Sequence, residues 1–378
     1  MFGDVIQRAR KLGRLLRISR AAAVERVSPE SLALRNFGSS PIANLGPRGE
    51  RAASLQELEL TDDEVERAKA ARFTVGIVLH TLESDWARQQ VDGITATLRD
   101  YGAEVIDVVD CEFAVARQIA SLDVMIGRRP DAIISIPVDD TETAEAHRRV
   151  GEAGITLVLM DNAPRGLQPG QDYAAVVSAD NRANGLIAAE TLEPHVPSEG
   201  TVGVIGFDAD FFATDEREAA FKQWFQDHRP DAVVLRTDFH DPSEAGPATE
   251  TFLRVNPAID AVFVVWDTPA LAAVKAARRL GRDIAITTVD LGEEAAIELA
   301  AGGLIKGLGA QQPYDQGVAE ALAVIKALLR SPLPAWVAVP ALPVTRENVL
   351  EAFERVWHVP PPARLLEAYD LAGVAPGS

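Results

Sequence analysis

The sequence contains only one cysteine, Cys111, so it cannot form an internal disulfide, and carboxylates beside the thiol indicate an unreactive side chain. No apolar run approaches the roughly 18 residues that a helical membrane span needs. The chain also lacks a Walker A loop, Gly-x-Ser-x-Gly, His-Glu-x-x-His and Cys-x-x-Cys. Its six histidines show no metal-ligand spacing. We therefore predict no metal, no cofactor and no catalytic residue.

Basic residues are in a minority, with 37 Lys and Arg against 56 Asp and Glu, which gives a net charge of −19. The imbalance lies beyond residue 72, because residues 1–72 hold 13 basic and 10 acidic side chains. An acidic body repels phosphate backbones, so nucleic acid is not the expected partner.

Residues 1–35 are basic, and arginines interrupt every apolar stretch, so no signal-peptide core is visible. Residues 18–27 faintly resemble the second helix of a helix-turn-helix, but the glycine of the tight turn is missing. Residues 36–54 are rich in Gly, Pro and Ser, which is typical of a linker. We expect residues 1–60 to be a poorly ordered basic leader and linker. Thr61 and Glu64 then form a capping box that starts a short helix.

From residue 73 onward, apolar β-branched runs alternate with amphipathic segments. This alternation predicts an α/β fold with parallel sheets and helices on both faces. The predicted strands cover residues 73–79, 103–109, 131–136, 155–160, 174–178, 201–206, 232–237, 260–265, 284–289 and 305–309.

About ten strands are many for one twisted sheet, so we expect two doubly wound lobes joined by a hinge. The chain is predicted to cross between them at residues 176–180 and 307–311. The N-terminal lobe then comprises 61–179 and 312–338, the C-terminal lobe 180–311 and 339–358, and the tail 359–378.

Polar or aromatic residues follow several predicted strands directly. Ligands bind at the carboxyl ends of the strands in such sheets, so two facing lobes would bring these residues to one cleft. Asp and Asn at strand ends also cap helices and form turns, so each position alone has two interpretations. The residues are His80, Thr81, Asp161, Asn162, Trp266, Asp267, Asp290, Gln311 and Gln312.

Several stretches resemble type I periplasmic sugar-binding proteins, the ribose-binding branch of the solute receptors of ABC transporters. The resemblance covers residues 61–356 and rests on motifs such as His80–Gly93, Pro130–Val138, Leu159–Asn162, Ser178–Gly185, Ala261–Asp267, Thr288–Asp290 and Gln311–Gly317. It implies a hinged two-lobe receptor, monomeric and periplasmic, which binds a sugar or polyol and passes it to permease subunits without catalysis. The absence of a visible signal peptide leaves the cytoplasm as an open alternative.

The resemblance also implies the ligand contacts. Asn162 stands where an arginine is common in ribose receptors, and Trp266 where asparagine is common, so ribose itself is in doubt. Carboxylates, an arginine and amides suit hydroxyl groups, and tryptophan rings suit the C–H face of a polyol. The implied ligand-binding residues are Ser84, Trp86, Asp161, Asn162, Phe212, Arg217, Trp266, Asp290 and Gln311.

Two alternatives remain open at this point. The first is a LacI-like transcription regulator that senses a ligand and uses residues 1–35 to bind DNA. The second is a sugar-processing enzyme in which Asp161 and Asp290 act as an acid/base pair.

Overall fold

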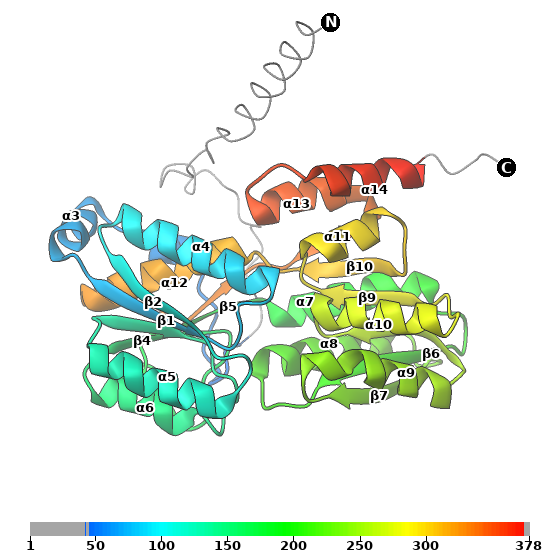
Figure 1. Ribbon diagram of the computed structural model, residues 1–378, viewed down its shortest axis with the longest axis horizontal. Helices are drawn as coiled ribbons and strands as arrows, with labels where there is room; N and C mark the ends of the chain where they lie inside the picture. The colour runs from blue at the N-terminus through cyan, green and yellow to red at the C-terminus, as the bar shows by residue number, and fades with distance from the viewer. Residues whose placement is uncertain (1–41, 43–44, 374–378) are drawn as a thin grey trace, which may run out of the picture. The chain divides into compact units, whose positions relative to one another are not determined.

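The computed structural model describes residue 42 and residues 45–373 (Figure 1). Within residues 45–373 the chain forms two six-stranded sheets, each flanked by helices on both faces. The α/β fold class with two doubly wound lobes is therefore confirmed. Ten of the twelve strands match the predicted strands to within two residues at either end.

The first lobe has a fully parallel sheet in the order β11-β5-β4-β3-β1-β2. Its strands are β1 (Thr74–Leu79), β2 (Glu104–Asp110), β3 (Ala132–Ser135), β4 (Thr156–Met160), β5 (Ala175–Ala179) and β11 (Trp336–Val339). Helices α4 (Asp85–Asp100) and α12 (Pro313–Leu328) pack together on one face, while α5 (Val115–Arg128) and α6 (Ala144–Glu152) cover the other (Figure 1).

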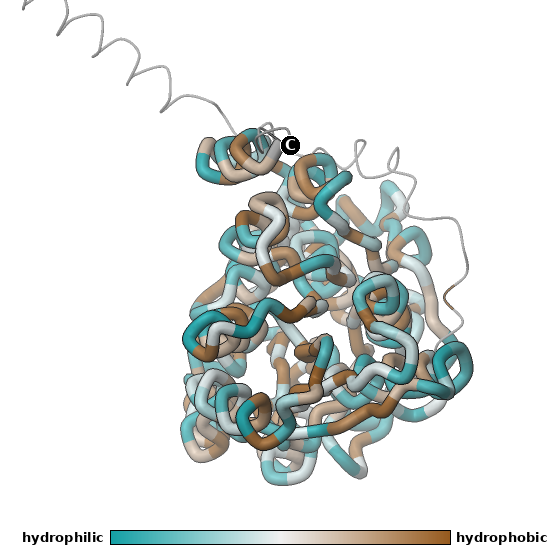
Figure 2. Tube along the Cα trace, turned by 90° about the vertical axis from the view of Figure 1, so that its right-hand side faces the viewer, coloured by the Kyte–Doolittle hydropathy of each residue, from teal (hydrophilic) through white to brown (hydrophobic). Residues whose placement is uncertain are grey.

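The second lobe repeats the arrangement in the order β12-β10-β9-β8-β6-β7, and only the edge strand β12 is antiparallel. Its strands are β6 (Thr201–Phe207), β7 (Val233–Phe239), β8 (Ile259–Val264), β9 (Ala285–Val289), β10 (Ile305–Ala310) and β12 (Leu342–Thr345). Its helices are α7 (Asn181–Leu192), α8 (Phe212–His228), α9 (Ala245–Val255), α10 (Asp267–Arg279), α11 (Glu293–Ala300) and α13 (Val349–Trp357). Figure 2, which faces this lobe, shows hydrophobic and hydrophilic residues interspersed along its helices, as expected for helices with one buried face.

The chain passes between the lobes three times. It crosses at Asp180 between β5 and α7, at Gln311 and Gln312 between β10 and α12, and at Pro340 and Ala341 between β11 and β12. The first two lie where the sequence predicts them. The lobe bounds expected from the sequence also imply the third crossing, since they divide the chain between residues 338 and 339. The strands β11 and β12 themselves were not predicted, because they are only four residues long and prolines surround them.

Residues 45–60, expected to belong to a poorly ordered linker, pack against the first lobe. Ala53 extends the edge of the sheet, since its N–H donates to the Trp336 carbonyl at 3.0 Å and its carbonyl accepts from Ala338 N–H at 3.0 Å. The guanidinium of Arg48 donates to the carbonyl oxygens of Ala163, Pro164 and Leu167. Composition predicted a linker here, but these long-range backbone contacts hold the segment in place. The short helices η1 (Leu55–Leu58) and α3 (Asp62–Ala71) follow, and α3 starts with the predicted Thr61–Glu64 capping box.

Residues 363–373 of the C-terminal tail form helix α14 (Ala363–Gly373), which packs against α11. Arg364 pairs with Glu293 and Glu294, and Arg346 lies 4.8 Å from the Tyr369 ring centroid. Among the described helices, none is both long and apolar enough to cross a membrane.

Candidate functional site

A cavity of about 420 Å³ lies between the two lobes. Segments at the ends of β1, β2, β3 and β4 form its first-lobe side, and segments at the ends of β6, β7, β8, β9 and β10 form the other. These are the carboxyl ends of parallel strands, where open α/β sheets place their ligands. The lining residues are His80, Thr81, Glu83, Ser84, Trp86, Glu112, Phe113, Ile136, Asp161, Phe207, Phe211, Thr214, Arg217, Asp241, Pro242, Ser243, Trp266, Asp267, Thr268, Asp290 and Gln311.

Asp161 is the buried acid of the first-lobe wall, with only 2% of its surface exposed. Ser178 Oγ donates to its Oδ1 at 2.8 Å, and Gln316 Nε2 approaches the same oxygen at 3.5 Å. Burial raises the pKa of Asp161 to about 6, while the nearby Arg217 opposes this shift. The carboxylate is thus held in place and poorly compensated by positive charge.

Arg217 is the basic residue of the cavity, and it reaches in from α8. Its Nε donates to Asn181 Oδ1 at 2.8 Å, and its Nη1 donates to the Val265 carbonyl at 3.1 Å. Asn181 in turn donates to Ser178 Oγ at 3.0 Å, so one hydrogen-bond chain links Arg217 to Asp161 across the lobes. This chain orients the guanidinium plane before any ligand arrives.

The second-lobe wall carries two more buried acids, Asp267 and Asp290. Gln311 Nε2 donates to Asp290 Oδ1 at 2.6 Å, and Gly292 N–H donates to Asp267 Oδ2 at 2.9 Å. Burial raises the pKa of both carboxyls, and the charge of Asp290 raises that of Asp267 further.

Aromatic rings form the apolar part of the cavity. Phe207 packs edge-on against Trp266, with ring centroids 5.3 Å apart, and contacts Phe113 and Phe211. His80 stacks near Phe211 and touches Trp86 edge-on. Burial lowers the pKa of His80 to about 3, so its imidazole is neutral at physiological pH.

Most of the residues proposed as ligand contacts from the sequence lie on this cavity. Ser84, Trp86, Asp161, Arg217, Trp266, Asp290 and Gln311 line it, and Ser84 also caps α4 by accepting from Ala87 N–H at 3.1 Å.

Asn162 and Phe212 do not line the cavity. Asn162 is fully buried, and its Oδ1 accepts from Ala213 N–H at 3.1 Å, so it joins the lobes behind the cavity. Phe212 is the first residue of α8, and the preceding Phe211 lines the cavity instead. For this aromatic wall the sequence prediction is off by one position.

Several lining residues were not predicted as contacts. His80 and Asp267 were noted at strand ends but not chosen, because a histidine or an aspartate there often serves a turn or a helix end. Phe113, Phe207 and Asp241 gave no sequence signal, because the loops that carry Phe113 and Asp241 have no recognisable motif and Phe207 is the last residue of the apolar strand β6.

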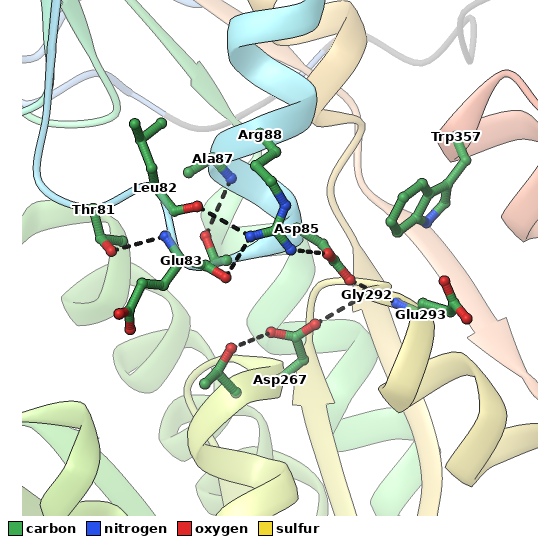
Figure 3. Close-up of polar contacts among 12 residues, drawn as sticks. Thr81, Leu82, Glu83, Asp85, Ala87, Arg88, Asp267, Gly292, Glu293 and Trp357 are labelled. Atoms are coloured by element: carbon green, nitrogen blue, oxygen red, sulfur yellow. Dashed lines mark hydrogen bonds and ion pairs between the residues drawn. The ribbon is translucent and has the colours of Figure 1, made fainter. Parts of the chain in front are cut away.

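The lobes also touch beside the cavity, at the N-terminus of α11 (Figure 3). The Asp85 carboxylate, on α4 of the first lobe, accepts from Glu293 N–H at 2.9 Å and also pairs with Arg88. A carboxylate is favoured at a helix N-terminus, where backbone N–H groups lack partners. Asp85 therefore holds the lobes together on this side.

A second contact between the lobes involves Asp210. Asp210, after β6, accepts from Thr141 Oγ1 at 2.8 Å and pairs with Arg165 of the first lobe. The Asp210 carbonyl also accepts from Asp140 N–H at 3.2 Å. These bonds and the Asp85 contact hold the two lobes together around the cavity.

Comparison with known proteins identifies a family whose model matches most of the chain. The model of the periplasmic binding protein domain family matches residues 75–331. The ribose import binding protein RbsB of Bacillus subtilis is 25% identical over 223 residues, which cover 59% of this chain and 71% of that protein.

Solved structures share the fold. A solute-binding protein from Agrobacterium vitis, bound with α-D-tagatopyranose, has a TM-score of 0.68 at 23% identity and covers 73% of this chain and 96% of its own. One from Bacillus halodurans, with bound myo-inositol, has a TM-score of 0.66 at 24% identity and covers 75% and 98%. The DNA-binding segment that a regulator would need, residues 1–35, lies outside the described residues.

Proposed function

Because the chain belongs to the family of periplasmic binding proteins, we propose that it is the solute receptor of an ABC transporter and binds a sugar or sugar alcohol between its lobes. The closed, acid-rich and aromatic-lined cavity is the observation that carries this proposal. The receptor performs no chemistry and presents its ligand, as a monomer in the periplasm, to the membrane permease subunits.

The side chains of the cavity suit a polyol. Hydroxyl groups both donate and accept, so they can bond to the carboxylates of Asp161 and Asp290 and to the Arg217 guanidinium. Trp266 and Phe211 offer flat apolar faces for the C–H groups of the ligand. The names of related proteins supply first candidates, namely ribose, tagatopyranose and myo-inositol.

Thermal-shift screening of pentoses, hexoses, polyols and cyclitols tests the proposal. A ligand at a hundred times its dissociation constant should stabilise the protein by about 2.7 kcal/mol. If no member of such a panel raises the melting temperature, the proposal fails.

Variants locate the site. Asp161→Ala and Arg217→Ala should each abolish the ligand-dependent shift, because each removes a charged group from the cavity wall. Asp283→Ala and Arg355→Ala, which change exposed residues of the same types, serve as matched controls and should keep the full shift. Circular dichroism of the ligand-free variants checks folding. A full shift in both cavity variants would place the ligand elsewhere.

A further inference from the structure

The charge of the cavity is strongly unbalanced. Six of its lining residues are acidic, and Arg217 is the only Lys or Arg among the described residues that line it. His80 does not redress the balance, because its buried imidazole is neutral. The acidic lining residues are Glu83, Glu112, Asp161, Asp241, Asp267 and Asp290.

The innermost three carboxyls carry the argument. Asp161, Asp267 and Asp290 are 2%, 8% and 7% exposed, so water screens their charges poorly. Burial raises the pKa of all three carboxyls, because one guanidinium does not compensate three buried negative charges. The protein by itself therefore disfavours the ionised form of this cluster, and a bound cation would relieve the cost.

Three buried side-chain atoms of the lining residues have no hydrogen-bond partner within the described structure. Gln311 Oε1 and His80 Nδ1 are buried and have no partner within the described structure, and the neutral imidazole can accept at this nitrogen. Trp86 Nε1 is the corresponding open donor. The carboxylates of Asp161, Asp267 and Asp290 accept when ionised, and an alkylammonium group has three donors and no acceptor, so it suits this wall better than a hydroxyl group does.

The aromatic wall favours the same ligand. The ring faces of Trp266, Phe207 and Phe211 attract a cation as well as C–H groups, and this attraction strengthens where water is excluded. A ligand with a carboxylate or phosphate would instead meet the repulsion of the acidic lining.

We propose that the preferred ligand is an amino-polyol, in which an ammonium group replaces one hydroxyl of a sugar, sugar alcohol or cyclitol. This inference rests on the proposed function and narrows its ligand class. The ammonium lies among Asp161, Asp267 and Asp290, and the remaining hydroxyls bond to Arg217 and Gln311.

Matched ligands test the inference. Titration calorimetry compares D-glucosamine with D-glucose and N-acetyl-D-glucosamine, 1-amino-1-deoxyribitol with ribitol, and scyllo-inosamine with scyllo-inositol. For the scaffold that binds, the amine should bind at least tenfold more tightly than its hydroxyl analogue, and N-acetylation should remove the gain. A neutral polyol that binds as tightly as its amine overturns the inference but leaves the proposed function intact. If no compound binds, the proposed function itself fails.

The number of protons released when the ligand binds gives an independent test. Binding of the amine near pH 6 should release protons from the cavity carboxyls, whereas a neutral polyol should release fewer. Calorimetry in two buffers with different ionisation enthalpies measures how many protons are released for each ligand bound. Equal release with both ligands contradicts the inference.

A single variant tests the charge itself. Asp267→Asn keeps the shape of the side chain and an acceptor for Gly292 N–H, but removes one negative charge. The preference for amine over hydroxyl analogue should fall about tenfold. Asp283→Asn, on an exposed loop of the same lobe, should leave the preference unchanged. An unaltered preference in Asp267→Asn overturns the assignment of the ammonium to this cluster.

Discussion

Asp161 and Asp290 occupy equivalent places in the two lobes, directly after β4 and β9. Both have a left-handed backbone, with φ of 54° and 76°. In each case the backbone N–H still donates to the neighbouring strand, to Val177 or to Gly309. Such a conformation costs of order 1 kcal/mol, and strain of this kind is often stored at functional sites. The turn aims each carboxylate away from the end of its strand and toward the cavity.

His147 gives a prediction at the residue scale. It is fully buried in α6, with Nδ1 2.9 Å from the Thr143 carbonyl and Nε2 3.0 Å from Ser135 Oγ. Because a carbonyl only accepts, Nδ1 donates to Thr143 and Nε2 accepts from Ser135. Burial lowers the pKa of His147 to about 4.

The unfolded imidazole takes up a proton near pH 6.5, whereas the folded one stays neutral until about pH 4. The neutral, buried His147 therefore stabilises the folded protein fully above pH 6.5, and this stabilisation is lost as the pH falls from 6.5 toward 4. When the pH is lowered from 7 to 5, His147 should lower the free energy of unfolding by about 2 kcal/mol. Urea unfolding at both values should show a correspondingly smaller loss in His147→Gln. The same loss in both proteins would contradict the buried neutral state.

The sequence predicted Asp161, Trp266, Asp290 and Gln311 as contacts because strand ends are visible as changes from apolar runs to polar or aromatic residues. It placed Phe212 rather than Phe211 on the wall, since the first residue of a helix cannot be fixed from periodicity. It passed over Asp267 because an aspartate at the start of a helix needs no ligand to explain it. The packing of the two lobes decides which strand-end carboxylates face the cavity, and local sequence patterns do not predict that packing.

At the scale of elements, each lobe contains a pair of helices that pack closely against each other at glycine residues. In the first lobe α4 and α12 cross where Gly93 and Gly317 meet, and a Cβ at Gly317 would lie 2.3 Å from the Gln90 carbonyl oxygen. In the second lobe a Cβ at Gly185 of α7 would lie 2.1 Å from the Arg217 carbonyl oxygen of α8. These backbones pack too closely to admit any side chain.

Gly317→Ala should therefore destabilise the protein by roughly 1–3 kcal/mol, because the two helices must separate. Gly127→Ala is the matched control, since Gly127 lies in α5 and a methyl group there would meet no atom within 4 Å. It should be neutral or stabilise by up to about 1 kcal/mol through helix propensity. Denaturant midpoints compare the two variants. Equal effects would mean that the crossing tolerates a methyl group.

At the scale of the whole molecule, the Asp85 contact predicts how closure supports binding. The contact exists only where the lobes meet, so it stabilises the closed form relative to any open form. Asp85→Asn weakens a charged hydrogen bond to the N-terminus of α11. Ligand affinity should fall about five- to tenfold, in keeping with a loss of about 1 kcal/mol.

Small-angle scattering checks the cause, because ligand-free Asp85→Asn should populate a more extended form than the parent protein. Asp283→Asn again supplies the control for a lost surface charge. Unchanged affinity and unchanged dimensions would show that Asp85 only caps α11.

The three crossings between the lobes have a consequence for how the protein is made. The first-lobe sheet, which begins at residue 74, obtains its covering helix α12 and its edge strand β11 only when residues 313–339 emerge from the ribosome. The buried apolar face of β3, β4 and β5 remains uncovered on the α12 side until then. The lobe that is synthesised first is thus among the last parts to be completed. Translation of residues 180–312 is the interval in which the nascent chain most needs protection from aggregation.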